Sequence, residues 1–431
     1  IFECQVEGVA IHSPDQKSVF RIVEENAKGY ILRRHEFGQF LLEEALKLGV
    51  VLLDETLVLG PIIEINGASD YNVVGVRIKN KQGEKEIRTR VVVDASGMAA
   101  IIRKKLPPEM NITKEIKRED VMACYREKRV LTSGQKIDTK YCGVYLNQTI
   151  APRGYYWIFP AGTEGDRQIV NVGLGVQAKN GHLNPKEQLY KFILNRKLFG
   201  LSERINQDNG FGSVPVRRCL EVMVSNGIMI VGDAACQVNP IHGGGIGPSM
   251  IGGCLVAKAI MRASSGNHHI LPDDYLVQYT RDYLREYGLK QAKLEILRIL
   301  IQGLTDEEIN LGMRIKLLTE EDLARAGSNQ ETHFSHSEKL RRLTRALWFG
   351  GWSGLKLVRK LARVVKLMKQ IERHYQWYPR SVLNISRWKE KTEKLFEQAE
   401  QELRPEKEEK LTEEEIAAYQ AMREQIYSNR F

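Results

Sequence analysis

The sequence predicts a mixed α/β protein (α+β mixed) in which an antiparallel sheet interrupts an α/β domain and a helical region follows. Residues 1–110 alternate strand-like segments with one helical segment, and residues 112–218 repeat strand-and-turn patterns rich in aromatic residues. Nearly every residue after Asp273 follows a helical pattern. A chain of 431 residues with 42% hydrophobic and 27% charged residues is long enough for two or three domains and excludes wholesale disorder.

Residues 1–111 are predicted to form the first part of the α/β domain. Strands are expected at VEGVAIHS and SVFRIV, and a helix from about His35 to Leu48. The segments VVLLDETLVL, NVVGVRIKN and KEIRTRVVVDASG then predict a small β-meander, with Gly83 supplying a positive φ at one turn. The chain opens without Met and without a signal-peptide pattern, so we expect the natural protein to begin upstream and this domain to be N-terminally truncated.

Residues 112–218 are predicted to form a separate antiparallel domain. The strand-like segments are DVMACYREK, KYCGVYLNQ, GYYWIFPAG and QIVNVGLGVQ, and one helical segment, NPKEQLYKFILNRKLF, interrupts them. Residues 219–272 return to a buried apolar strand, a glycine-rich turn and a helix. We therefore expect residues 219–272 to complete the first domain, which makes that domain discontinuous.

Residues 273–431 are predicted to form a helical region with an acidic tail. Between Lys339 and Arg373 the chain has eleven basic residues and one acidic residue, a local charge of +10 that equals the formal net charge of the whole chain. Apolar residues from Leu355 to Ile371 recur every three or four positions among these bases, as in a basic amphipathic helix. The apolar face either packs on the protein's own helices or contacts an anionic membrane, and the nearby aromatic residues Trp348, Phe349 and Trp352 favour the membrane.

Six scattered cysteines lack the spacing of metal ligands, so we expect reduced thiols, a cytoplasmic setting and no metal site. The pattern GxGxxA from Gly173 to Ala178 does not open a helix directly, so it does not predict a dinucleotide site. No stretch of the chain is both long and apolar enough to predict a transmembrane helix.

The most specific pattern is a buried strand that ends in Gly232-Asp233 and is followed by Asn239-Pro240 and a glycine run that enters a helix. Free backbone N–H groups at the start of such a helix can face an anion or an electron-rich ring edge. The carboxylate of Asp233 can accept hydrogen bonds from a polyol. The alternative is a tight strand-to-helix turn with a capping aspartate.

A second pattern is the alternation of Tyr155, Trp157 and Phe159 along one strand, followed by Gly173 and Gly175 on the strand expected to pair with it. An aromatic face of this kind can line a tunnel for an isoprenoid chain. The alternative is an aromatic stripe that faces the protein's own core.

Together with YILRRHEFGQFL, VVVDASG, VPVRR and the sequence Tyr378-Pro379-Arg380, these motifs resemble the geranylgeranyl reductase family, and archaeal digeranylgeranylglycerophospholipid reductases most closely. Members are flavoproteins of the p-hydroxybenzoate hydroxylase fold. The resemblance implies FAD as cofactor, bound at Arg34, Val58, Asp233, Gly244, Gly245, Ile246 and Gly247. The family's N-terminal GxGxxG, its acidic ribose-binding residue and its flavin-loop cysteine have no counterpart in this sequence.

The same resemblance implies the reduction of C=C bonds in geranylgeranyl chains of archaeal ether lipids, with the lipid held by Tyr155, Trp157, Phe159, Gly173 and Gly175. It implies NAD(P)H or reduced ferredoxin as electron donor, no nucleic-acid partner, and a cytoplasmic location on the inner face of the cell membrane. The imidazole of His242 is the one candidate proton donor, against a structural role that we favour. The alternative functions are an FAD-dependent monooxygenase or halogenase and a non-catalytic lipid-binding protein.

Overall fold

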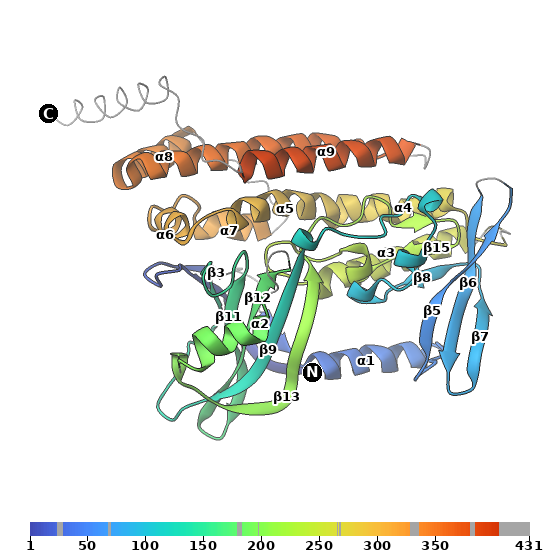
Figure 1. The fold of residues 1–431 in the computed structure, drawn as a ribbon, viewed down its shortest axis with the longest axis horizontal. Helices are drawn as coiled ribbons and strands as arrows, with labels where there is room; N and C mark the ends of the chain where they lie inside the picture. The colour runs from blue at the N-terminus through green and yellow to red at the C-terminus, as the bar shows by residue number, and fades with distance from the viewer. Residues whose placement is uncertain are drawn as a thin grey trace.

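A seven-stranded sheet, three small sheets and a stack of helices make up the described part of the fold (Figure 1). The computed structural model describes residues 1–23, 29–67, 70–178, 183–196, 198–264, 266, 269–327, 336–379 and 384–404. The acidic tail after residue 404 and Arg380 lie outside these ranges.

The large sheet has the strand order β13-β9-β12-β11-β10-β2-β3. Its strands are β2 (Gly8–His12), β3 (Val19–Val23), β9 (Val121–Leu131), β10 (Tyr141–Tyr145), β11 (Tyr155–Glu164), β12 (Arg167–Gln177) and β13 (Leu201–Pro215). All neighbours are antiparallel except β10 and β2, which pair in parallel. The placement of β2 and β3 corrects the sequence-based expectation, which put them in the α/β domain, because here they extend the antiparallel sheet.

The two faces of this sheet are distinct. Tyr156 and Ile158 point into a buried core, where Leu189 and Ile193 pack on them from the helix α2 (Pro185–Leu189) and the turn that continues it. The residues between them in β11 face the opposite side, since successive side chains of a strand alternate. The aromatic row Tyr155, Trp157 and Phe159 is therefore not the core stripe that the sequence left open as an alternative.

Two three-stranded sheets and a two-stranded ribbon complete the β-structure. Their strands are β1 (Phe2–Val6), β4 (Gly29–Leu32), β5 (Leu57–Ile65), β6 (Tyr71–Asn80), β7 (Gly83–Arg88), β8 (Val92–Asp94), β14 (Val224–Ser225) and β15 (Ile228–Ile230). The expected meander is β5-β6-β7, and Gly83 has the positive φ predicted for it, 110°. The prediction that VVVDASG ends this meander was wrong, because β8 instead pairs in parallel with β15 in the other three-stranded sheet. The strand expected across VVLLDETLVL begins only at Leu57, because Glu55 turns the chain with a φ of 47°.

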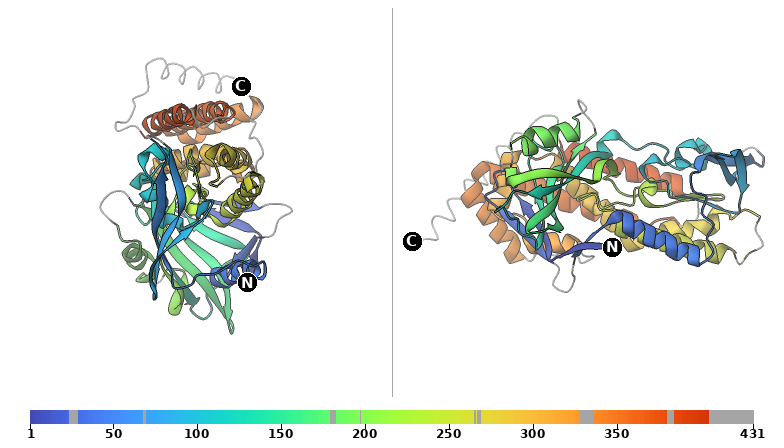
Figure 2. Two further views of the ribbon diagram at one scale, coloured as in Figure 1. Left: turned by 90° about the vertical axis from the view of Figure 1, so that its right-hand side faces the viewer. Right: turned by 90° about the horizontal axis from the view of Figure 1, so that it is seen from below.

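The helix α1 (Arg34–Lys47) agrees with the expected helix to within one residue at each end and runs between the large sheet and the β5-β6-β7 sheet (Figure 1). The later helices are α3 (Ile246–Ser264), α4 (Asp273–Tyr283), α5 (Leu289–Gln302), α6 (Asp306–Arg314), α7 (Glu320–Gly327), α8 (His336–Tyr375) and α9 (Ile385–Leu403). Figure 2 shows α8 and α9 as the outermost layer, on the side of the molecule away from α1.

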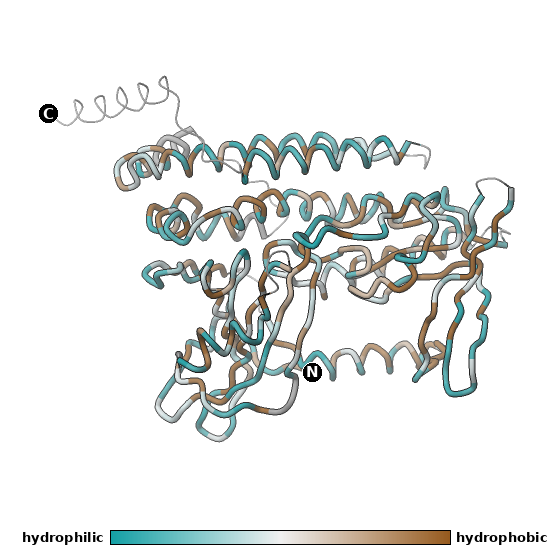
Figure 3. The backbone as a smooth tube through the Cα atoms, in the orientation of Figure 1, coloured by the Kyte–Doolittle hydropathy of each residue, from teal (hydrophilic) through white to brown (hydrophobic). Residues whose placement is uncertain are grey.

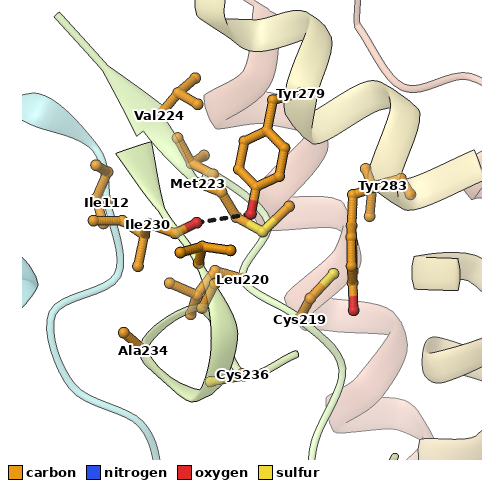
Figure 4. Close-up of a cluster of buried hydrophobic side chains, with 14 of the residues drawn as sticks. Ile112, Cys219, Leu220, Met223, Val224, Ile230, Ala234, Cys236, Tyr279 and Tyr283 are labelled. Carbon is orange, nitrogen blue, oxygen red and sulfur yellow. Dashed lines mark hydrogen bonds between the residues drawn. The ribbon is translucent and has the colours of Figure 1, made fainter. Parts of the chain in front are cut away.

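The main core lies where β15 and the following turn meet α4 (Figure 4). Tyr279 and Tyr283 of α4 are fully buried there, and the Tyr279 hydroxyl donates to the carbonyl of Ile230 at 2.8 Å. Tyrosines of this size contribute much of the buried apolar area, provided that their hydroxyl groups find partners. This core fixes the end of β15, where the glycine-rich loop that leads to α3 starts.

The basic amphipathic helix predicted from Leu355 to Ile371 lies within α8, but its apolar face is not free. Val364, Leu367 and Ile371 are at most 1% exposed and belong to the main core, and α8 packs on α5, α6 and α9. Figure 3 shows hydrophilic and hydrophobic segments alternating along α9, as expected for a helix with one buried side. The packing within the protein, not membrane contact, therefore explains this apolar pattern.

The helix α8 also bends at Gly351, whose φ of 52° and ψ of −136° are not helical. The aromatic residues around the bend remain at the surface, where Trp348 is 41%, Phe349 65% and Trp352 39% exposed. Within the described part of the chain, no helix is long and apolar enough to cross a bilayer.

Candidate functional site

A glycine-rich loop links β15 to α3 and forms one side of the site. Gly232 leaves β15 with a φ of 68°, a conformation that glycine adopts at little cost, and Gly243 has the same φ. Asn239 shapes the loop between them, because its side-chain oxygen accepts the backbone N–H of Ile241 at 2.9 Å. Helix α3 then begins at Ile246.

Two buried glutamines that sequence reasoning missed hold this loop in place. Gln237 accepts the backbone N–H of Gly232 at 2.8 Å and donates to the Tyr279 hydroxyl at 2.8 Å. Gln291 of α5 donates to the carbonyls of Arg217, Cys236 and Val238. The side chains of Gln237 and Gln291 are buried, so they cannot exchange these hydrogen bonds for bonds to water. The two glutamines therefore hold the loop against the core.

The carboxylate of Asp233 lies at the start of α3. A Cβ built on Gly245 would be 3.0 Å from Oδ1 of Asp233 and 3.2 Å from Val238. No side-chain hydrogen bond of Asp233 occurs among the described residues, and burial raises the pKa of its carboxyl group. The carboxylate of Asp233 is therefore half-buried without a side-chain partner, and Gly245 beside it leaves little room for a side chain. Such a polar group is available to a ligand.

The side chain of Arg34, at the first residue of α1, faces Asp233 closely enough that its charge partly opposes the effect of burial on the pKa of Asp233. Its neighbour Arg33 instead forms an ion pair with Glu36 at 3.1 Å. The structure thus brings together two residues predicted for cofactor binding, Arg34 and Asp233, that are nearly 200 positions apart in the sequence.

His242 lies on the exposed side of the glycine loop, and its Nδ1 accepts the backbone N–H of Gly244 at 3.1 Å. Desolvation lowers the pKa of the imidazole, and the charge of Lys290 acts in the same direction. A neutral ring that accepts through Nδ1 has its proton on Nε2. This backbone bond gives His242 the structural role that the sequence favoured.

The glycine loop and the large sheet meet at Tyr155. Its hydroxyl donates to the carbonyl of His242 at 2.7 Å, and the side chain of Val214 in β13 would lie 3.4 Å from a Cβ on Gly243. Burial raises the pKa of the Tyr155 phenol well above its usual range, so the phenol keeps its proton. The aromatic face of β11 therefore begins directly beside the loop that carries Asp233.

Glycines on the neighbouring strand make room for the aromatic row. Tyr155 pairs with Gly175 and Trp157 with Gly173 across β11 and β12. A Cβ on Gly173 would be 2.4 Å from Cζ2 of Trp157, so the indole lies over the glycine, and its Nε1 donates to Asn171 at 3.0 Å. Any side chain at position 173 would displace this ring.

The same face of the sheet continues across β9 and β13. Gly175 pairs with Cys124, and Cys124 with Gly212, while Gly210 lies two pairs further along β13, opposite Arg126. A Cβ on Gly210 or Gly212 would have no neighbour within 4 Å. Sequence reasoning missed this extension, although the motif Gly210-Phe211-Gly212 is the signal that could have revealed it.

The ribbon of β1 and β4 closes the far end of the aromatic face. Lys128 of β9 forms an ion pair with Glu3, and the Cys4 thiol donates to the carbonyl of Pro160. The aromatic face thus lies between the glycine loop at Tyr155 and this ribbon near Phe159. We define this bounded surface, with the glycines of β12 and β13 as its floor, as the aromatic trough.

Val58, the remaining predicted cofactor residue, is not part of this cluster. It lies in β5, half-buried against the main core, near the end of α1 opposite to Arg34 (Figure 1). No group of three or more His, Cys, Asp or Glu side chains in the described ranges could hold a metal ion. Burial raises the pKa of both Cys124 and Cys236 to about 11, so both are thiols at neutral pH.

Comparisons with known proteins agree with this geometry. Residues 120–210 match a family model described as the geranylgeranyl reductase catalytic domain. The chain is 34% identical over 400 residues to a digeranylgeranylglycerophospholipid reductase of Sulfolobus acidocaldarius, covering 91% of this chain and 83% of the relative. It is 35% identical over 267 residues to a reductase of the same name from Methanosarcina acetivorans, covering 61% of each protein.

Two solved structures share the fold. A geranylgeranyl bacteriochlorophyll reductase-like protein from Thermoplasma acidophilum has a TM-score of 0.64 and 23% identity, covering 84% of this chain and 83% of that one. A flavin-dependent brominase has a TM-score of 0.55 and 18% identity, covering 80% and 83%. Both are flavoprotein folds of the p-hydroxybenzoate hydroxylase type, as the sequence predicted.

Proposed function

This chain belongs to the geranylgeranyl reductase family, and we propose that its glycine loop and its aromatic trough form a single reaction site. The protein is an FAD-dependent oxidoreductase that reduces C=C bonds in the geranylgeranyl chains of archaeal ether lipids. The observation that carries the proposal is the hydrogen bond of 2.7 Å between Tyr155 and His242, because it fixes the trough beside the loop.

In this proposal the residues around Asp233 hold the cofactor. The open carboxylate of Asp233 accepts hydrogen bonds from the ribityl hydroxyls, Arg34 faces the cofactor from α1, and the backbone from Gly244 to Gly247 lies against the flavin ring. Helix N-termini favour electron-rich groups, and glycines allow the backbone to approach closely. FAD, once reduced by the electron donor, would supply the hydride that adds to one carbon of the double bond, and a proton would add to the other carbon. Val58 is proposed for the adenine end.

The trough holds the isoprenoid chain in this proposal. Trp157 and Phe159 offer apolar ring faces, and the open space above Gly210 and Gly212 on the same sheet face leaves room for a branched chain. An apolar surface that excludes water suits a reduction that has to deliver hydride to carbon and not to solvent. Tyr155 keeps its proton and positions the loop, and so acts as a positioning residue.

The test compares two tyrosines on opposite faces of one strand. Tyr155→Phe removes the hydroxyl that bonds to His242, whereas Tyr156→Phe removes a hydroxyl on the core face of β11. We expect Tyr155→Phe to lower turnover of a geranylgeranyl phospholipid about tenfold, as the loss of one well-placed hydrogen bond does, with flavin content unchanged. Tyr156→Phe serves as the matched control. Equal turnover of both variants would show that the aromatic trough takes no part in the reaction.

The electron donor is proposed to be NAD(P)H or reduced ferredoxin. Anaerobic mixing of the flavin-loaded protein with NADPH, NADH or reduced ferredoxin, followed by the loss of visible flavin absorbance, distinguishes them. Bleaching within the turnover time by only one reductant identifies the donor. Bleaching by none of the three would exclude both proposed classes.

We further propose that the protein contacts the membrane surface through the bend of α8 and not through the buried face predicted from the sequence. Trp348, Phe349 and Trp352 are exposed there, and basic residues such as Lys356 and Arg359 follow on the next turns. Aromatic side chains favour the membrane interface, and each nearby Lys or Arg contributes about 1 kcal/mol of attraction to anionic lipid.

Cosedimentation with anionic liposomes tests the membrane contact. Phe349→Ser should reduce binding at low salt, whereas Trp377→Ser, which removes an 81% exposed aromatic residue just beyond the other end of α8, should not. High salt should weaken binding of the unchanged protein. Equal binding of the two variants would show that the bend of α8 does not contact the membrane. Binding that does not change with salt would show that electrostatic attraction does not contribute to it.

A further inference from the structure

A cavity of about 230 Å³ lies on the opposite face of the large sheet from the aromatic trough. Its floor is formed by Tyr145, Ile158 and Phe199, and Ile158 points away from the trough because it alternates with Trp157 along β11. Neither the flavin loop nor the trough reaches this cavity, so the function proposed above leaves it unexplained.

The floor carries a hydroxyl group that no described residue uses as a hydrogen-bond donor. Tyr145 is only 9% exposed, and its hydroxyl makes no hydrogen bond with any described residue. The absence of a side chain at Gly143 leaves space next to it, since a Cβ there would be 3.3 Å from the hydroxyl oxygen. A ligand that accepts a hydrogen bond from this hydroxyl would therefore use a donor that the protein leaves available.

Further donors surround the same space. The ring of His12 stacks on Tyr145 with centroids 4.3 Å apart, and the guanidinium of Arg21 lies 5.6 Å from the ring centre of Tyr141. Lys136 lines the cavity from the loop between β9 and β10. Within the described part of the chain none of these three cationic or imidazole groups has an ion-pair or hydrogen-bond partner. One acid, Asp138, also lines the cavity.

The backbone at the floor is also strained. Phe199 has a φ of 61°, a left-handed conformation that costs a non-glycine residue of order 1–3 kcal/mol. Its ring contacts Tyr145 with centroids 5.2 Å apart, and strain of this kind persists where the surrounding structure requires a side chain in one place. The aromatic floor is therefore held in position beside the donors.

We propose that this cavity binds the phosphoryl group of a small phosphate ester. Arg21, Lys136 and His12 line the cavity together with Tyr145, and several separate donors suit the three terminal oxygens of a tetrahedral group better than the two of a planar carboxylate. The volume exceeds that of phosphate alone, and the apolar floor at Phe199 and Ile158 accommodates the organic part. The ester comes either from a free metabolite or from a lipid headgroup.

Isothermal titration with glycerol phosphate, inorganic phosphate and acetate, and cosedimentation with phosphatidic acid vesicles, test this proposal without needing flavin or turnover. Arg21→Gln is compared with Lys191→Gln, which removes an exposed charge outside the cavity. Tyr145→Phe removes only the hydroxyl. The far-UV circular dichroism of each variant checks that it folds.

Saturable binding of glycerol phosphate that Arg21→Gln and Tyr145→Phe each weaken about tenfold or more, with Lys191→Gln unaffected, would support a free phosphate ester. The same dependence on Arg21 and Tyr145 seen only with vesicles would identify a lipid headgroup. If Tyr145→Phe left binding unchanged, surface charge alone would explain the binding and the proposal would be overturned. Acetate binding as tight as phosphate binding, or no binding of any of these ligands, would overturn it as well.

Discussion

Adding a methyl group at Gly173 should damage the aromatic trough. The new Cβ would lie 2.4 Å from Cζ2 of Trp157 and 2.5 Å from the carbonyl oxygen of Tyr125, whereas carbon atoms in contact prefer about 3.5–4.0 Å. The indole would have to move by more than about 1 Å, and the backbone of β9 cannot move easily because it is paired on both sides, with β12 and β13. Overpacking of this kind costs about 1–3 kcal/mol, and loss of the bond from Trp157 to Asn171 adds about 1 kcal/mol.

We therefore expect Gly173→Ala to lower the free energy of unfolding by about 2–4 kcal/mol, measured by denaturant titration. The matched control is Gly212→Ala, since a Cβ there meets nothing within 4 Å and the same sheet face carries it. Alanine in a strand costs less backbone entropy than glycine, so the control should be unchanged or more stable by up to about 1 kcal/mol. Equal stability of the two variants would refute the packing of Trp157 on Gly173.

Four further predictions concern the loop and the helical layer. Asp233→Ala should weaken FAD retention about tenfold to a hundredfold, because charge-assisted hydrogen bonds to the ribityl hydroxyls are worth about 1.5–3 kcal/mol, and Gly245→Val should expel the flavin; flavin absorbance after dialysis measures both. Gln291→Leu should lower the free energy of unfolding by about 1–3 kcal/mol or more, since it deprives three buried carbonyls of their donor. His374 is buried and its pKa lies at about 4 instead of 6.5, mainly because of desolvation, so the folded state favours the neutral ring. Stability should fall by up to about 3 kcal/mol as pH drops from about 6.5 to about 4, because the unfolded chain then binds the proton first.

Each of these expectations has a clear opposite. Flavin retained after dialysis in Asp233→Ala would remove that carboxylate from the cofactor site, and a normal flavin spectrum with Gly245→Val would make the loop a simple turn. Unchanged stability of Gln291→Leu would mean that the loop is held elsewhere. If a His374→Gln protein lost as much stability between pH 6.5 and 4 as the unchanged protein, other titrating groups would be responsible for that loss.

The sequence predicted the elements whose cause is local. Gly83 and the glycines around Asp233 marked turns because they supply backbone conformations that other residues avoid. The alternation of Tyr155, Trp157 and Phe159 marked a strand because side chains alternate at period two. A glycine run after a buried strand is rare and so marked the loop as a candidate site, while the individual cofactor residues in it were selected from the family resemblance and remain predictions.

Features that depend on distant packing could not be predicted. β2 pairs in parallel with β10, joining Gly8 to Tyr141, and no local pattern specifies which sheet an isolated strand joins. Gln237 and Gln291 look like surface residues in a sequence, yet tertiary structure buries them against carbonyls and N–H groups. In α8 the sequence predicted one apolar face, but its periodicity does not specify what covers that face, and only the packing on α5 and α9 shows that the protein's own helices do.

The most direct test of the central claim is to locate the isoprenoid chain on the protein. A geranylgeranyl phospholipid carrying a photoreactive group along its chain can be cross-linked to the flavin-loaded protein, and the labelled residues identified by mass spectrometry. The account predicts labels on the aromatic trough, at Tyr155 to Phe159, Gly173 to Gly175 and Gly210 to Gly212. Labels confined to the opposite sheet face, around Tyr145 and Phe199, or to α8 would contradict it.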